Sequence, residues 1–282
     1  MIIKNKIKSL YLYDNVVKKL LTDSKEGREY LARVISAALN KQLKPIAFEL
    51  SMVHPNIGVN KNVVNGEADL ILEGEHFFVN IEINNFKSKA LLQKNFSYMC
   101  HLVLRQMKNS KDYDKDIKQV YQININNFGI LNNGKFIVIS KMMDIESHQV
   151  TREDLTTIDI DVAKIMKMDY TDIKEKGRAS LEYLLCLLVC EDEDALRKLY
   201  KGDELMEAMV DKAIQLTCSF DNSLNYDAQK LREHCIFEEG ERNKQEDVVR
   251  RMLAEKCNIG FISRITGLSK EEINELKRQS CK

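Results

Sequence analysis

The chain has no net charge, few residues that break secondary structure and no long hydrophobic run. Lysine plus arginine and aspartate plus glutamate both number 43, so no global basic field indicates nucleic-acid binding. Only two of the 282 residues are prolines, Pro45 and Pro55, which argues against a flexible interdomain linker before the last third. The longest apolar run, residues 184–189, is too short to cross a bilayer.

Several sequence motifs of metal sites, disulfide frameworks and common enzyme classes are also absent. The seven cysteines include no CxxC pair, and their odd number fits reduced thiols better than a disulfide framework or a zinc site. The five histidines form no HxxH or HExxH pattern, and no phosphate-loop, dinucleotide or nucleophile-elbow motif is present. The first residues lack the apolar stretch and cleavage site of a secretory signal, so we expect a soluble cytoplasmic protein without a membrane partner.

Hydrophobic spacing predicts a mixed α/β protein whose central sheet is flanked by helices. Amphipathic spacing indicates helices, and apolar–polar alternation indicates strands. Nearly everything beyond about residue 152 reads as helix. We therefore predict a sheet near residues 45–140, a first domain of residues 1–235 and a helical C-terminal region of residues 236–282. The predicted helices before residue 140 are 10–21, 26–43 and 87–108, and the predicted strands are 77–84, 119–124 and 135–140.

Acidic residues in residues 66–84 have the spacing of a paired strand face. Alternate side chains of a strand share one face, which places Asn80, Glu82 and Asn84 together and the apolar residues between them on the core face. A two-residue turn at residues 74–75 would fix the hairpin register. That register sets Asp69 opposite Asn80. It also sets Glu67 opposite Glu82.

Three carboxylates would then converge on one small volume. Cross-strand neighbours on one face lie about 5 Å apart and diagonal neighbours about 7 Å apart, which brings Glu67, Asp69 and Glu82 together. Like charges this close repel unless a cation neutralises them. Mg²⁺ is typically held by one or two carboxylates, with water and phosphate completing its shell. From spacing alone, the open alternative is a solvated polar face on an edge hairpin.

The sequence resembles a known family in this stretch and beyond it. Asp69 followed by Ile81-Glu82-Ile83-Asn84 is similar to the D…(D/E)-x-K core of the PD-(D/E)XK nucleases. More narrowly, the chain resembles the Rpn family of recombination-promoting nucleases and transposases. The resemblance covers most of the chain and implies a restriction-endonuclease-like core sheet with flanking helices. It extends over residues 94–98, 104–107, 111–113, the VYQINI run at 120–125, and 262–269.

One position departs from the family pattern. Asn84 stands where the superfamily has lysine and the Rpn family commonly has glutamine. An amide can donate a hydrogen bond to the attacking water, but it brings no cation to stabilise the developing charge. Lys94 on the predicted helix is the candidate replacement. A solvated lysine that does not serve the site is the alternative.

The C-terminal residues have the pattern of a short helix, a turn and a final helix. Ser269 with Glu272 forms a capping box, and Gly267 suits the end of the preceding helix. Acidic residues near the start of the last helix oppose contact with phosphates. We therefore expect a packing or oligomerising hairpin that forms a homodimer through the C-terminal helices, with a DNA-reading helix-turn-helix as the alternative.

The resemblance implies a Mg²⁺-dependent endodeoxyribonuclease, with Mn²⁺ as a second usable ion. Its metal ligands would be Asp69 and Glu82. The hairpin register adds Glu67 as an assisting carboxylate, with Glu49 as its alternative, and we expect Asn84 and Lys94 to be the other catalytic residues. The implied partner is DNA, and the implied role is cleavage linked to recombination, transposition or defence. Two alternatives stay open: a catalytically degenerate relative that binds DNA or protein without cutting, and a helical assembly protein whose tail is the functional part.

Overall fold

The chain divides into two compact units, Met1–Asp221 and Asn222–Lys282. The computed structural model describes residues 14–41, 48–53, 56–57, 66–67, 70–85, 87, 91–107, 117–131, 134–219 and 245–280. For residues 48–53, 56–57 and 66–67 it describes the backbone. The predicted domain boundary at residue 235 lies outside the described residues and stays a prediction.

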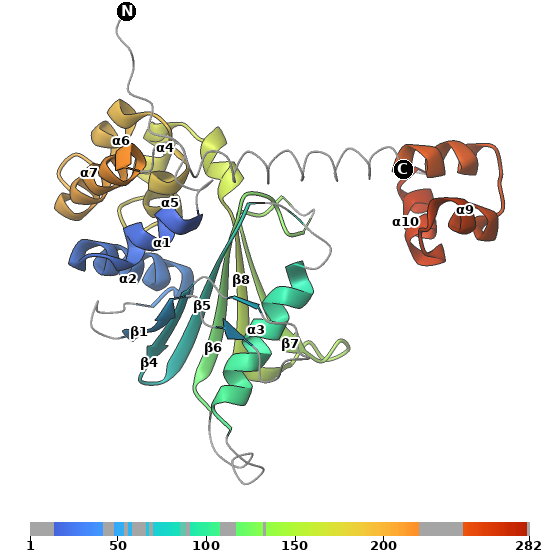
Figure 1. The fold of residues 1–282 in the computed structure, drawn as a ribbon, viewed down its shortest axis with the longest axis horizontal. Helices are drawn as coiled ribbons and strands as arrows, with labels where there is room; N and C mark the ends of the chain where they lie inside the picture. The colour runs from blue at the N-terminus through green and yellow to red at the C-terminus, as the bar shows by residue number, and fades with distance from the viewer. Residues whose placement is uncertain are drawn as a thin grey trace, which may run out of the picture. The chain divides into compact units, whose positions relative to one another are not determined.

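A six-stranded mixed sheet forms the centre of the first unit (Figure 1), with the strand order β1-β4-β5-β6-β8-β7. The central strands β5, β6 and β8 run parallel, and every other neighbouring pair runs antiparallel. A separate two-stranded sheet pairs β2 with β3. The strands are β1 Phe48–Val53, β2 Asn56–Ile57, β3 Gly66–Glu67, β4 Leu70–Gly74, β5 Phe77–Asn84, β6 Gln119–Asn126, β7 Ile137–Met143 and β8 Val150–Asp161.

The helices of this unit lie on both sides of the sheet, as its alternating and amphipathic sequence predicts. Helix α3 crosses one face, and the remaining helices gather on the side away from α3 (Figure 1). None of the described helices is long and apolar enough to span a bilayer. Their bounds are α1 Asp14–Thr22, α2 Lys25–Leu39, α3 Leu91–Arg105, the 3-10 helix η3 Val162–Lys167, α4 Tyr170–Glu175, α5 Leu181–Val189, α6 Glu193–Leu199 and α7 Glu204–Ser219.

Strand β8 contradicts the prediction that nearly everything beyond residue 152 is helical. Its second half alternates, with Ile158 and Ile160 on one face and Asp159 and Asp161 on the other. The β-branched residues of this segment favour an extended backbone over a helix. The sheet therefore extends about twenty residues further along the chain than the predicted limit at residue 140.

The hairpin register also differs from the prediction. Strand β4 continues to Gly74, the loop is Glu75 and His76, and Glu73 pairs with Phe78. A Cβ on Gly74 would lie 2.5 Å from the ring of Phe77, so the glycine makes room for this ring rather than forming the turn. The predicted turn at residues 74–75 is wrong, and every cross-strand pair derived from it shifts.

In the described strands, Ile71 pairs with Asn80 and Leu70 pairs with Ile81. The predicted placement of Asp69 opposite Asn80 is therefore wrong. The placement of Glu67 opposite Glu82 is also wrong, because the backbone of Glu67 pairs with Asn56 in the separate sheet.

Residues on the sheet face away from α3 form an aliphatic core. This face is buried along all three parallel strands because the helices cover it. Its buried members include Leu70, Leu72, Val79, Ile81, Ile83, Ile123, Ile125, Ile158 and Ile160.

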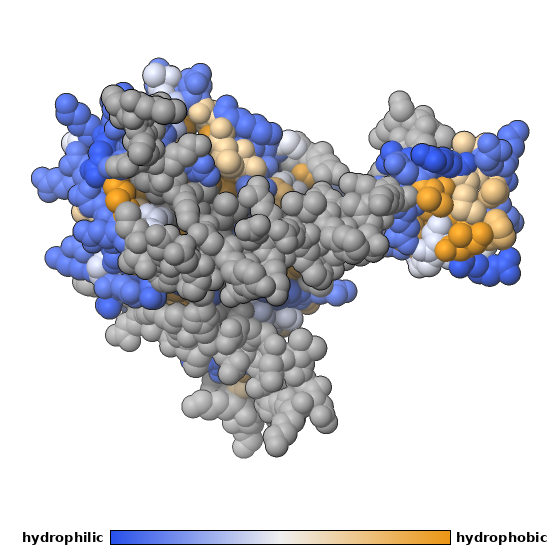
Figure 2. Space-filling view, turned by 45° about the horizontal axis from the view of Figure 1, so that its top comes forward, coloured by the Kyte–Doolittle hydropathy of each residue, from blue (hydrophilic) through white to orange (hydrophobic). Residues whose placement is uncertain are grey.

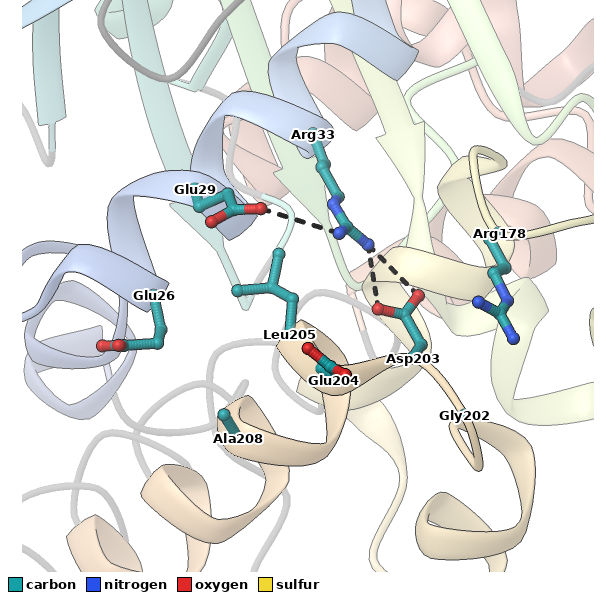
Figure 3. Close-up of a pocket in the computed structure, with 9 residues that line it drawn as sticks. All are labelled: Glu26, Glu29, Arg33, Arg178, Gly202, Asp203, Glu204, Leu205 and Ala208. Carbon is teal, nitrogen blue, oxygen red and sulfur yellow. Dashed lines mark hydrogen bonds and ion pairs between the residues drawn. The ribbon is translucent and has the colours of Figure 1, made fainter.

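A buried carboxylate ties three helices of the first unit together. Asp203 is 4% exposed and accepts two 3.1 Å hydrogen bonds from Nη1 of Arg33 on α2. It also accepts from the hydroxyl of Tyr183 on α5 and from the backbone N–H of Met206 in the first turn of α7. Figure 3 shows Glu29 and Asp203 both directed at the guanidinium of Arg33.

Glu29, Arg33 and Asp203 line a pocket of about 550 Å³. None of the five predicted site residues contributes to it. Two arginines and four carboxylates surround it, so the lining favours no single charge of ligand. We interpret the Asp203 cluster as structural. The lining residues are Glu26, Glu29, Arg33, Arg178, Gly202, Asp203, Glu204, Leu205 and Ala208 (Figure 3).

The second unit has a small core of its own. A helix at residues 245–254, α9 Ile259–Thr266 and α10 Lys270–Ser280 pack around Val249, Ile262, Ile273 and Leu276. Ser269 and Glu272 form the expected capping box, in which each side chain accepts from the other's backbone N–H. Gly267 ends α9 with a φ of 72°, in the left-handed region.

Hydrophobic side chains gather on the face of this unit that Figure 2 shows. Its exposed large hydrophobic residues are Val248, Phe261 and Ile265. An apolar surface of this kind is a common feature of interaction sites.

Replacing Asp203 tests the structural interpretation of its cluster. We expect Asp203→Ala to lower the free energy of unfolding by about 2 kcal/mol, because it removes a helix cap and the acceptor of Arg33 and Tyr183. Urea denaturation followed by circular dichroism measures this change. The matched control is Asp211→Ala, which breaks an exposed ion pair with Arg197 and should cost less than about 0.5 kcal/mol. Equal losses in the two variants would contradict the interpretation.

Candidate active site

The sheet face beneath α3 changes from apolar to polar along the parallel strands. Phe78, Val120 and Leu155 are aligned neighbours on β5, β6 and β8, and all three are buried. Every second residue from there to the carboxyl ends of these strands is polar. Ligands of parallel sheets commonly bind near these ends. The three polar rows, in strand order, are Asn80–Gln122–Thr157, Glu82–Asn124–Asp159 and Asn84–Asn126–Asp161.

Helix α3 covers both halves of this face. Tyr98, Met99 and Leu102 in its second half pack on the apolar row. In its first half, Nζ of Lys94 lies 2.9 Å from Oε2 of Glu82, which is fully buried. The same ammonium lies 5.5 Å from the ring centroid of Tyr98. Lys94, not the residue two positions after Glu82, therefore supplies a positive charge beside this carboxylate.

A chain of hydrogen bonds crosses the polar rows from Glu82. Asn80 donates through Nδ2 to Oε1 of Glu82 at 3.2 Å and to Oε1 of Gln122 at 2.9 Å. Gln122 donates to Oδ1 of Asn124 at 2.8 Å. Asn124 donates to Oδ1 of Asp159 at 2.9 Å. This chain links carboxylates on β5 and β8 through three amides.

A shorter branch begins at Asn84. Its Nδ2 donates to Oδ1 of Asn126 at 2.9 Å, and Asn126 donates to the same Oδ1 of Asp159 at 3.1 Å. One N–H of the Asn84 amide is therefore held by the neighbouring strand. Asp159 is the acceptor at which both branches meet.

Burial sets the electrostatics of this site. Desolvation raises the pKa of Asp159 above its usual range, and the hydrogen bonds from Asn124 and Asn126 offset part of that rise. Glu82 is 0% exposed, and a buried carboxylate is costly unless it is paired and hydrogen-bonded. Lys94 and Asn80 provide these partners.

The structure brings together three of the five predicted site residues. Glu82 and Lys94 are in contact, and Asn84 lies on the same face of β5 as Glu82. Asp69 lies outside the described residues, as does the side chain of Glu67. Their predicted metal-binding roles stay predictions.

The alternative of a solvated edge hairpin is wrong. Strand β5 is the third of six strands, and Asn80, Glu82 and Asn84 are at most 5% exposed. A polar strand face buried on a central strand needs partners on its neighbours, and the amide and carboxylate groups of β6 and β8 provide them.

Sequence reasoning missed the polar residues of β6 and β8. Residues 119–124 indicated a strand, but their polar positions were given no role beyond the family resemblance. The signal was present at the carboxyl ends of both strands, where polar residues alternate with isoleucines at 122–126 and at 158–161. The missed residues are Gln122, Asn124, Asn126, Asp159 and Asp161.

Divalent metal ions are used generally by PD-(D/E)XK nucleases, and the chemistry of the described residues fits such an ion. Glu82 offers a carboxylate at the polar end of the sheet, and hard cations of this class prefer oxygen ligands. The described residues contain no cluster of three or more histidine, cysteine, aspartate or glutamate side chains suited to a metal.

Neutralising Asp159 should make stability less dependent on pH. The folded protein binds the Asp159 proton more tightly than the unfolded chain does, so wild-type stability falls as pH rises from the unfolded to the folded pKa. At pH values above the folded-state pKa of Asp159, we expect the free energy of unfolding of Asp159→Asn to equal or exceed that of wild type. Below the unfolded-state pKa, we expect the difference between the two proteins to be smaller. Urea denaturation across pH measures the difference, and a difference independent of pH would contradict the expectation.

Comparison with known families gives one match. The family model described as PD-(D/E)XK nuclease family transposase matches residues 12–234, a range that includes the whole sheet, α3 and the polar rows. No curated protein and no solved structure matches the chain. The fold agrees with this match, since helices flank a mixed sheet and the inner strand β5 carries Glu82. The chain therefore belongs to the PD-(D/E)XK nuclease family transposases.

Proposed function

We propose that the chain is a metal-dependent DNA endonuclease that hydrolyses phosphodiester bonds. The observation that carries the proposal is the 2.9 Å contact between Lys94 and the buried Glu82. Lys94 thereby supplies the positive charge that Asn84, at the third position of the motif, lacks. A carboxylate and a lysine side by side are the two charged groups that the D…(D/E)-x-K motif brings together.

Asp69 and Glu82 are the proposed metal ligands, with Glu67 assisting. Supporting this pairing, Leu70 follows Asp69 in the sequence and pairs with Ile81, the residue before Glu82. Mg²⁺ or Mn²⁺ bound there would polarise the phosphodiester and lower the pKa of a bound water. Glu82 would contribute one carboxylate oxygen to that ion.

Lys94 and Asn84 have separate proposed roles. The ammonium of Lys94 would stabilise the negative charge that develops on the phosphate oxygens. Asn84 would help to place the attacking water, and its hydrogen bond to Asn126 would hold its amide in one orientation. The lysine is partly exposed, at 40% of its side chain, so substrate could reach it.

The proposed substrate is DNA, and the proposed setting is cytoplasmic cleavage linked to recombination, transposition or defence. We also propose that the C-terminal helices form a homodimer. The exposed Val248, Phe261 and Ile265 support an interaction surface there. Glu271 and Glu272 in the first turn of α10 favour this use over contact with DNA phosphates.

A second candidate function is binding to DNA without cutting. The observation that favours it is the residue type at position 84, since an asparagine brings no positive charge where the nuclease motif has lysine. Catalytic assays distinguish the two candidates.

Digestion of supercoiled plasmid with Mg²⁺ or Mn²⁺ tests the proposal. We expect the wild type to nick or linearise the plasmid, and we expect Asp69→Ala and Glu82→Gln each to abolish cutting, because each loses a proposed metal ligand. Circular dichroism establishes that each variant is folded. Folded wild-type protein that cuts with neither ion would reject the nuclease and leave the binding function.

The role of Lys94 has a matched test within the same sheet. Lys118 also pairs with a strand glutamate, Glu73, at 2.7 Å and lies 5.3 Å from the ring centroid of Phe78, but at the apolar end of the face. We expect Lys94→Met to slow cutting by about 10²- to 10³-fold, as loss of one charge-stabilising group does elsewhere. Lys118→Met should change the rate by less than about threefold. Equal effects would assign Lys94 a structural role only.

A further inference from the structure

We propose that Asp159 on β8 is a positioning residue that orients Glu82 and Asn84 through the buried amides of β5 and β6. The inference rests on the proposed nuclease function and adds to it a residue two strands away from the acidic motif. Asp159 would not touch the substrate or the metal. Its effect would pass through hydrogen bonds that are all present in the structure.

The geometry places Asp159 where the two branches of the network meet. Oδ1 of Asp159 accepts from Asn124 at 2.9 Å and from Asn126 at 3.1 Å. The first branch continues through Gln122 and Asn80 to Glu82, and the second continues to Asn84. Both of the described motif positions on β5 are therefore connected to one carboxylate.

The chemistry of an ionised carboxylate gives the network its direction. A carboxylate only accepts hydrogen bonds, so Asn124 and Asn126 must direct their N–H groups at Asp159. Their carbonyl oxygens then accept from the next residue of each branch. The same step repeats at Gln122, whose carbonyl oxygen accepts from Asn80.

Each hydrogen bond from Glu82 to Asp159 has the same donor-to-acceptor orientation along this branch, with the exception of the bond that Asn80 donates to Glu82 itself. Asn80 has two N–H groups, of which one goes to Gln122 and the other to Oε1 of Glu82. Had Asn80 been flipped, its carbonyl oxygen would face the Glu82 carboxylate and repel it. Asp159 thus favours the amide arrangement in which Glu82 is held as an acceptor with Lys94 beside it.

Burial prevents water from replacing these bonds. Asn80, Gln122, Asn124, Asn126 and Asp159 are at most 6% exposed. Hydrogen bonds in such surroundings are stronger than in water and polarise one another. A break at any point would leave a buried donor or acceptor without its partner.

The cost of burying Asp159 also points to function. Its pKa is raised because burial disfavours the charged form, so an ionised carboxylate at this position costs stability. Residues that cost stability while satisfying a directed polar network are typical of functional sites. A purely structural bridge between β6 and β8 is the competing explanation.

Measuring the affinity for Mn²⁺ distinguishes a positioning role of Asp159 from a purely structural role. The experiment measures the Kd for Mn²⁺ by electron paramagnetic resonance on the full-length wild type and on Asp159→Leu, Asp159→Asn and Thr156→Val. We expect Asp159→Leu to weaken binding by about 10- to 100-fold, the usual effect of removing a group that orients a metal ligand. Asp159→Asn keeps an acceptor oxygen and should stay within about threefold of wild type.

Thr156→Val is the matched control, because Thr156 is also a buried polar residue of β8 but lies on the face away from α3. It should bind Mn²⁺ as wild type does. If Asp159→Leu is folded and binds with wild-type affinity, the inference is overturned, and the carboxylate is a structural bridge.

Gln122→Met tests the same network if Asp159→Leu does not fold. This variant keeps the length of the side chain and breaks only the branch to Glu82. We expect it to weaken Mn²⁺ binding at least tenfold. Wild-type affinity in folded Gln122→Met would equally overturn the inference.

Glu82→Gln distinguishes failure of the inference from failure of the proposed function. If Glu82→Gln loses Mn²⁺ binding while Asp159→Leu and Gln122→Met retain it, the metal site stands and the positioning role is wrong. If Glu82→Gln binds Mn²⁺ as wild type does, the proposed metal site is wrong, and the positioning role is rejected with it.

Discussion

The burial of the Glu82 carboxylate is the constraint on which the rest of this sheet face depends. A carboxylate with no exposed surface, on the third of six strands, is costly unless it has polar partners. Lys94 meets it from α3, and Asn80 meets it from its own strand. Because Asn80 has a second N–H to satisfy, the requirement spreads to β6 and from there to β8. The hydrogen bonds that begin at one buried carboxylate thereby extend over three strands.

Much of the architecture follows from sequence patterns alone. The amphipathic spacing that predicts α2 and α3 reflects one buried face per helix, and the alternation that predicts β5 reflects a strand between two layers. The family resemblance rests on Asp69 and Glu82 together with the VYQINI run, and it gives the correct fold class. Lys94 could be selected because it lies on the predicted helix that should pack beside the acidic face of the strand.

Other features depend on contacts that a single sequence does not contain. The turn chemistry of Gly74 is overridden by packing, since the ring of Phe77 occupies the space where a Cβ would lie. Strand β8 reads as part of a helical region until β6 is placed beside it, because its aspartates look solvated. The burial of Asp159 depends on the pairing of β8 with β6, which joins residues more than thirty positions apart in sequence. Long-range pairing of this kind is what local pattern cannot supply.

The position of β8 in the chain has a consequence for synthesis. Strands β5 and β6 and helix α3 all leave the ribosome before β8, so a nascent chain that ends before Val150 carries the acidic motif without Asp159. Its polar rows would face an unfilled edge, and their amides would have no fixed direction. The hydrogen-bond network can therefore form only after β8 has been synthesised and has paired with β6.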